Sequence, residues 1–102
     1  MSVFSVHEGN FEAEVLHAGQ PVLLDFWAPW CGPCRMLGPV VEEIAQTHPE
    51  VKVGKVNVDE EPALAARFGV MGIPALFYLK DGEVVSSAVG ARPRASVEAM
   101  LK

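Results

Sequence analysis

The feature that most constrains the fold is one short segment of almost uninterrupted apolar residues. Residues 22–27 read Val-Leu-Leu-Asp-Phe-Trp, so that a single acid, Asp25, stands among five apolar side chains. Such a run is typical of a central strand that is covered on both faces, as in the parallel sheets of α/β proteins. The segment therefore predicts a buried strand in the middle of a sheet.

Strand and helix signals alternate along the rest of the chain. Strands are expected at residues 3–6, 22–27, 51–58, 75–79 and 83–89. Helices are expected from an Asn10 cap through Leu16, from Pro33 through Ala45, from residues 59–62 to Gly69, and from Pro93 through Leu101. Strands joined through helices run parallel, whereas Asp81-Gly82 between the last two strands predicts an antiparallel hairpin. We therefore expect one α/β domain over residues 1–102, with a mixed sheet of about five strands and helices on both faces.

Length and composition bound the possible functions. The 102 residues suffice for one domain, and half of them are apolar, which is enough for a compact core. The net charge is −5 and no Lys or Arg precedes Arg35, which argues against a nucleic-acid partner and against the basic start of an export signal. The apolar runs are too short to span a membrane. The sequence thus predicts a cytoplasmic protein without nucleic-acid or membrane partners.

Cys31 and Cys34 stand two residues apart, where the apolar strand leads into the next helix. A separation of one helical turn brings the two sulfurs within reach of a disulfide. Cys31 falls at the helix N-terminus, where unpaired N–H groups and the helix dipole favour a thiolate, the species that attacks disulfides. Cys34 lies one turn further in and is expected to be more sheltered, as suits a resolving thiol. The pair therefore predicts dithiol/disulfide exchange.

Two other uses of the cysteine pair fit the sequence less well. A zinc site would need two further ligands, but there is no second Cys pair, and His7, His17 and His48 show no ligand spacing. A purely structural disulfide would close too short a loop to gain much chain entropy. No metal site is therefore expected.

Residues 26–36, Phe-Trp-Ala-Pro-Trp-Cys-Gly-Pro-Cys-Arg-Met, resemble the active-site segment of the thioredoxin family nearly residue for residue. Further matches extend the resemblance over essentially the whole chain: Asp25, Pro39, Lys55, Gly72-Ile73-Pro74, Asp81-Gly82 and Gly90. The resemblance implies a thioredoxin fold with four helices, and a protein-disulfide reductase with Cys31 as nucleophile and Cys34 as resolving thiol. It also implies a monomer without bound cofactor. Such a monomer receives electrons from NADPH through thioredoxin reductase and reduces diverse disulfide-containing proteins.

Asp25 and Lys55 are expected to assist the dithiol. Burial of Asp25 in its apolar run disfavours the charged carboxylate, so its pKa should be raised and it could exchange protons near neutral pH. The alternative is an acid at a strand end that faces water. In thioredoxins the matching acid lies behind the resolving cysteine and helps to deprotonate it. The lysine that matches Lys55 pairs with that acid and moderates its pKa, although on pattern alone Lys55 could simply extend its amine into water.

A docking surface for substrates is expected around the dithiol. Trp30 directly precedes Cys31, and an exposed Trp at this place is best explained by contact with partners. By resemblance, the Ile73–Pro74 peptide bond is cis and faces the dithiol. The Ile73 backbone could also pair with an extended substrate strand. The expected surface comprises Trp30, Gly32, Pro33, Ile73, Pro74, Val89, Gly90 and Ala91.

The family pattern is not followed at every position. Ala75 stands where many thioredoxins have Thr, and Met71 where many have a basic or other residue. Both differences could alter partner preference without touching the chemistry. Gly32-Pro33 between the cysteines resembles the reducing members of the superfamily, since a His in place of Pro33 would suggest an oxidant or isomerase.

Two other functions stay open on the sequence alone. One is a disulfide oxidase or isomerase of an exporting compartment, which the discovery of an upstream leader would reveal. The other is a non-catalytic docking subunit that uses the apolar face around Trp30 and Pro74. A docking role would survive replacement of both Cys31 and Cys34 by serine, whereas a catalytic role would not.

Overall fold

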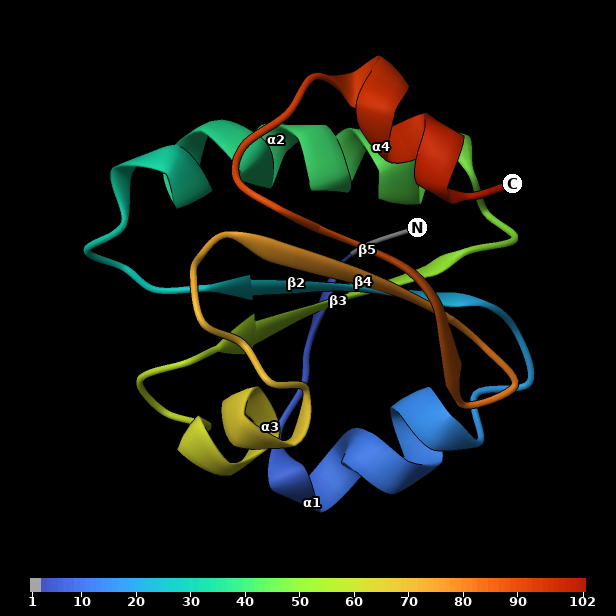
Figure 1. Cartoon of the computed structure of the whole chain (residues 1–102). Helices are drawn as coiled ribbons and strands as arrows, with labels where there is room; N and C mark the ends of the chain where they lie inside the picture. Colours follow the sequence, from blue (N-terminus) through green and yellow to red (C-terminus); the bar gives the residue numbers. More distant parts are fainter. Residues whose placement is uncertain (1–2) are drawn as a thin grey trace.

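The computed structural model describes residues 3–102 as a mixed β-sheet between two layers of helices (Figure 1). The strands are β1 (Phe4–Ser5), β2 (Val22–Trp27), β3 (Lys52–Asn57), β4 (Ala75–Lys80) and β5 (Glu83–Val89). The helices are α1 (Glu8–Phe11), continued by the π-helical turn η1 (Glu12–Leu16), α2 (Gly32–Thr47), α3 (Pro62–Arg67) and α4 (Arg94–Met100). The expected α/β class and element order are confirmed. Within the described residues, none of the helices has the length and apolar character needed to cross a membrane.

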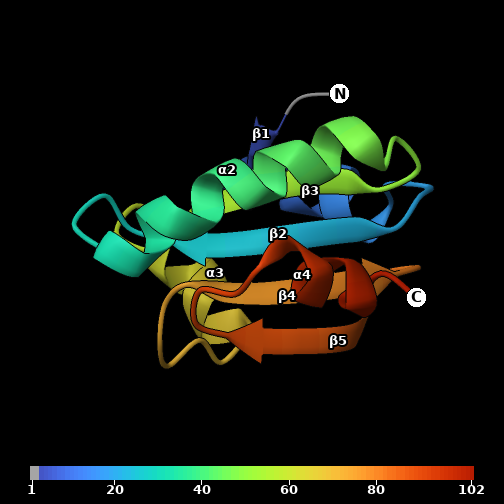
Figure 2. The same ribbon diagram turned by 90° about the horizontal axis from the view of Figure 1, so that it is seen from above.

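Strand β2 occupies the middle of the sheet, as its apolar sequence predicts. The strand order is β1-β3-β2-β4-β5, and β2 runs parallel to β3 and antiparallel to β4. Residues 22–26 are all buried. Helices α2 and α4 cover one face of the sheet, and α1 and α3 cover the other (Figure 1, Figure 2). The covering of both faces explains why β2 is apolar at every position except Asp25 instead of alternating.

Alternate residues of β2 enter two separate cores. Leu23 packs in one cluster with Val97 of α4. Phe26 packs on the opposite face, where its ring centre lies 5.1 Å from that of Phe68 and 5.4 Å from that of Phe77. Close packing on both faces fixes the position of β2. It therefore also fixes the start of the loop that leads to Cys31.

The N-terminal helix starts earlier than the sequence predicts. Helix α1 begins at Glu8, so the expected Asn10 cap is wrong. Asn10 lies in the first turn, where its Oδ1 accepts a hydrogen bond from the His7 N–H (2.7 Å) and its Nδ2 donates to the Ser5 carbonyl (3.0 Å). Its side chain therefore pairs with the backbone before the helix and not with the backbone inside it. Strands β1 and β3 are each one residue shorter at both ends than expected.

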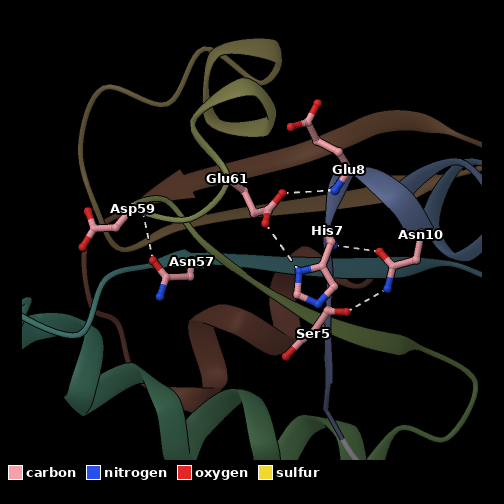
Figure 3. Close-up of polar contacts among 7 residues, drawn as sticks. All are labelled: Ser5, His7, Glu8, Asn10, Asn57, Asp59 and Glu61. Carbon is pink, nitrogen blue, oxygen red and sulfur yellow. Dashed lines mark hydrogen bonds and ion pairs between the residues drawn. The ribbon is translucent and has the colours of Figure 1, made fainter.

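Glu61, just before α3, provides a hydrogen-bond acceptor for the first residue of α1 (Figure 3). Its Oε1 accepts a hydrogen bond from the Glu8 N–H (3.1 Å), and its Oε2 lies 3.4 Å from Nδ1 of His7. The first N–H groups of a helix have no partner inside the helix. The Glu61 carboxylate supplies one from a distant part of the chain and thereby joins the start of α1 to the start of α3.

Replacing Glu61 by alanine is expected to lower the free energy of unfolding by about 1 kcal/mol, the usual effect of losing a helix cap. Urea unfolding of the native protein and the variant measures the difference. The matched control is Glu60→Ala, because Glu60 carries the same charge one residue earlier and is exposed. Equal losses in the two variants would contradict a capping role for Glu61.

Candidate active site

Cys31 and Cys34 lie at the N-terminus of α2, at the end of the loop that follows β2. Cys31 is the N-cap residue, with extended backbone angles (φ −89°, ψ 111°), and Cys34 lies in the first turn. The two residues form a disulfide, with their Cα atoms 5.3 Å apart. The Cys34 N–H donates to Cys31 Sγ (3.2 Å). A sulfur at this position faces the unpaired N–H groups and the positive end of a 16-residue helix, both of which favour a thiolate.

The Ile73–Pro74 segment faces Cys31 from the start of β4. Its peptide bond is cis, as the resemblance implied. The carbonyl oxygen of Ile73 lies 3.9 Å from Cys31 Sγ. The Gly90 N–H donates to the Pro74 carbonyl (2.8 Å), which brings the loop after β5 to the same place. Three segments that are distant in the sequence thus meet around the dithiol.

The two cysteines are equally buried in the disulfide form. Each exposes 4% of its surface, so the expectation that Cys34 is the more sheltered is wrong for this state. Both belong to one cluster with the buried Ala28, against which Ile73 and Trp27 pack. Because a covalent bond joins the sulfurs, the neighbours that cover one also cover the other. The cysteines differ instead in position, since Cys31 caps the helix while Cys34 lines a pocket.

Asp25 lies inside the core, with only 1% of its surface exposed. Neither of its carboxylate oxygens has a hydrogen-bond partner among residues 3–102. Burial raises the pKa of Asp25 from 3.8 to about 6, and the positive charge of Lys55 opposes that rise. The predicted elevation of the pKa is confirmed. A carboxyl group with this pKa can take up and release a proton near neutral pH.

Lys55 lies beside Asp25 on the neighbouring parallel strand, in direct register with it. Its Nζ lies 4.7 Å from the centre of the Trp27 ring. A pocket of about 360 Å³ opens here, lined by Trp27, Ala28, Pro29, Cys34, Arg35, Gly38 and Lys55. Water that enters this pocket can approach Cys34 and the Lys55 ammonium. Lys55 is the residue paired in register with the buried Asp25.

Large apolar side chains are exposed on either side of the dithiol. Trp30 and Val89 expose 65% and 64% of their surfaces. The Trp30 indole N–H donates to a carboxylate oxygen of Asp59 (3.0 Å), which orients the ring. Among the other predicted docking residues, Gly32, Pro33 and Ala91 are also exposed. Ile73 and Gly90 are half-buried. Pro74 is buried, so it lies beneath the expected docking surface and is not part of its exposed face.

Known proteins resemble the chain over nearly its whole length. The profile of the family described as Thioredoxin matches residues 2–102. The chain belongs to the thioredoxin family. It is 52% identical over 94 residues to Thioredoxin 1 of Synechococcus elongatus, covering 91% of this chain and 88% of that protein. It is 47% identical over 102 residues to thioredoxin of Porphyra purpurea (99% and 95% covered), and 47% identical over 93 residues to thioredoxin of Haemophilus influenzae (90% and 87% covered).

Family membership and site geometry agree on the chemistry. Thioredoxins are protein-disulfide oxidoreductases, and Cys31 and Cys34 form a disulfide in the Cys-Gly-Pro-Cys segment of this chain. The protein is a dithiol/disulfide oxidoreductase. Across residues 3–102 there is no group of three or more His, Cys, Asp or Glu side chains placed to hold a metal ion.

This thioredoxin also has a pocket beside Trp30 that the sequence does not predict. We call it the Trp30 pocket; it has a volume of about 420 Å³ and is lined by Trp30, Val58, Ala65, Val70, Met71, Gly72 and Ile73. Val58, Ala65 and Val70 are not part of the predicted docking surface. Their small apolar side chains are the only signal in the sequence. The packing of α3 beside Trp30 is needed to see that they form one surface.

Proposed function

We propose that this thioredoxin reduces disulfides in other proteins, with Cys31 as nucleophile and Cys34 as resolving thiol. We further propose that a thioredoxin reductase returns it to the dithiol form with electrons from NADPH. The observation that carries the proposal is the position of Cys31 at the N-cap of α2, with the Cys34 N–H directed at its sulfur (3.2 Å). These groups stabilise a thiolate, which is the species that attack on a disulfide requires. Gly32 and Pro33 keep the two cysteines one helical turn apart.

The reaction consists of two exchange steps. The Cys31 thiolate attacks one sulfur of a substrate disulfide, and the other substrate sulfur leaves and takes up a proton. Cys34 then loses its proton and attacks Cys31 Sγ, which releases the second substrate thiol. Two electrons have passed to the substrate, and the Cys31–Cys34 disulfide remains on the protein. The structure has this oxidised form.

Asp25 is the proposed acceptor of the Cys34 proton, and Lys55 adjusts its pKa. With a pKa of about 6, the Asp25 carboxyl is mostly ionised at pH 7 and is able to take up a proton. The pocket that Cys34 and Lys55 line admits water, which can carry the proton onward to solvent. Pro74 has no backbone N–H, so it places no competing hydrogen-bond donor next to the reactive sulfurs.

Substrates dock, in this proposal, on the exposed apolar surface around Trp30, Val89 and Ala91. A surface with little charge recognises shape more than sequence, and the Ile73 backbone offers hydrogen-bonding groups to an extended segment. The partners are therefore diverse disulfide-containing proteins, together with the reductase. We place the protein in the cytoplasm, where thiols are kept reduced, and expect it to act as a monomer.

A coupled assay with NADPH, a thioredoxin reductase and insulin tests the proposal. The rate of NADPH oxidation should rise in proportion to the added protein, because each catalytic cycle passes two electrons from NADPH to an insulin disulfide. The matched control is the Cys31→Ser variant, which should support no oxidation above the background of the reductase alone.

Two other outcomes would each overturn part of the proposal. If the protein catalyses insulin reduction by dithiothreitol but draws no electrons from NADPH, its electron donor is not a thioredoxin reductase. If it accelerates neither reaction, the reductase function itself is wrong.

A further inference from the structure

Met71 is an almost fully solvent-exposed thioether close to the dithiol. Met71 exposes 99% of its surface, and it lines the Trp30 pocket together with Trp30 and Ile73. The Ile73 carbonyl lies 3.9 Å from Cys31 Sγ, so that one short segment connects Met71 to the reactive sulfur. Nothing in the proposed mechanism uses this residue.

The other methionines of the described chain differ from Met71 in position or in exposure. Met36 is also exposed (72%), but it projects from α2 and lines neither of the two pockets described above. Met100 exposes only 9% of its surface and packs in the core under α4. Peroxides oxidise accessible thioethers to sulfoxides, so Met71 and Met36 are both open to this reaction while Met100 is protected. Of these, only Met71 touches the surface on which we place the substrate.

We propose that Met71 is a reversible oxidation site through which peroxides weaken substrate docking. This inference rests on the docking surface of the proposed function. Hydrogen peroxide transfers one oxygen atom to the Met71 sulfur, which loses two electrons and becomes a sulfoxide, and the peroxide is reduced to water. Methionine sulfoxide reductases reverse the change.

The sulfoxide makes the rim of the Trp30 pocket polar. The native Met71 side chain is flexible, apolar and polarizable, and such side chains adapt to many partner surfaces. The pocket beside Met71 is lined by Trp30, aliphatic side chains and a glycine, so a partner that fits it is expected to place apolar groups against the sulfoxide oxygen. Burying a polar group without a hydrogen-bond partner is unfavourable, so the complex becomes weaker. Cys31, Cys34 and Asp25 are unchanged, and the effect is therefore on KM and not on kcat.

The Met71→Gln variant introduces a permanent polar side chain of similar length. We expect its KM for insulin, reduced with dithiothreitol as electron donor, to rise by about fivefold while kcat is unchanged. The matched control is Met36→Gln, which makes the same chemical change at an exposed site outside the pocket and should keep the native KM. Both variants should reduce 2-hydroxyethyl disulfide at the native rate, because this small disulfide has no side chain to fill the pocket.

A second measurement tests the oxidation itself. The disulfide form is treated with hydrogen peroxide, since its cysteines are then already paired, and peptide mass spectrometry locates the sulfoxides. After re-reduction of the disulfide, the oxidised native protein should show the raised KM of Met71→Gln. The Met71→Leu variant should keep its KM through the same treatment, although Met36 remains oxidisable in it.

An unchanged KM in the oxidised native protein would overturn the inference, and so would an equal rise in oxidised Met71→Leu. Either result leaves the proposed function intact, because the small disulfide and insulin are still reduced. Failure of the proposed function has a different signature, in which even the untreated native protein accelerates neither reaction.

Discussion

Replacement of Cys31 by serine is expected to abolish catalysed disulfide reduction, with the rate falling by at least about a thousandfold, as when other enzymes lose their nucleophile. A serine hydroxyl is not ionised at neutral pH, so the N–H groups around position 31 have no thiolate to stabilise. Insulin reduction by dithiothreitol at pH 7, compared between the native protein and the variant, measures the loss. Activity within tenfold of the native rate would exclude Cys31 as the nucleophile.

The matched variant, Cys34→Ser, separates the roles of the two cysteines. It also loses turnover, but its Cys31 thiolate can still attack, and the mixed disulfide with the substrate is not resolved. We expect a covalent adduct with insulin on a non-reducing gel for Cys34→Ser and none for Cys31→Ser. The opposite pattern would mean that Cys34 attacks first. If neither variant forms an adduct with insulin, neither presents a reactive thiolate.

The Asp25→Asn variant is expected to be more stable than the native protein at neutral pH by about 3 kcal/mol, at about 1.36 kcal/mol for each pKa unit. The reason is that the pKa of Asp25 rises from 3.8 to about 6 when its side chain is buried without hydrogen-bond partners in the described chain. The neutral amide of asparagine needs no ionisation and keeps the volume of the side chain. Urea unfolding at pH 8 measures the difference between the two proteins.

The sign of the pH dependence follows from the raised pKa. The folded state binds the Asp25 proton more tightly than the unfolded state, so this group stabilises the fold below pH 3.8. That contribution is lost as the pH rises through about 6, and above it the buried charge is a net disadvantage. The stability advantage of Asp25→Asn should therefore grow between pH 4 and pH 7 and then level off. The matched control is Asp81→Asn, which makes the same change at an exposed hairpin residue and should not be more stable than the native protein.

The same variant should reduce insulin about tenfold more slowly, because a positioned proton acceptor contributes at least that much to a proton transfer. Measured from pH 6 to pH 8, the activity of the native protein should follow ionisation of a group with a pKa of about 6, and that of Asp25→Asn should not. A native rate with a native pH profile in the variant would remove Asp25 from the mechanism. The stability gain would stand even then, since it depends on the surroundings of Asp25 in the fold and not on its part in the reaction.

The central strand and the place of the dithiol could be predicted because local patterns decide them. An apolar run interrupted only by Asp25 requires cover on both faces, and the Cys-Gly-Pro-Cys segment begins after the three residues that follow it. The start of α1 could not be predicted in the same way. Its cap comes from Glu61, which lies more than fifty residues further along the chain and carries no local signal. Asn10 has the residue type of a cap but finds its partners before the helix.

The Trp30 pocket at the candidate site could not be predicted from local sequence patterns either. The disulfide pair and the buried acid, Cys31, Cys34 and Asp25, could be predicted because each stands out from its neighbours in residue type. Val58, Ala65 and Val70 do not, since a small apolar residue is as common in a core as on a docking surface. Their exposure beside Trp30 depends on how α3 packs, and on the loop that follows it, which only the folded chain determines.

The position of β2 in the sheet has a consequence for how motion is distributed over the molecule. Amide hydrogens of a strand that is paired on both sides and covered on both faces exchange with solvent only in the rarest openings of the fold. A short loop, residues 28–30, joins that strand to the redox pair, whereas Met71 and Ala91 belong to exposed segments outside the helices and strands. Hydrogen exchange is therefore expected to be slowest in the strand that leads to the sulfurs and faster in the exposed segments around them.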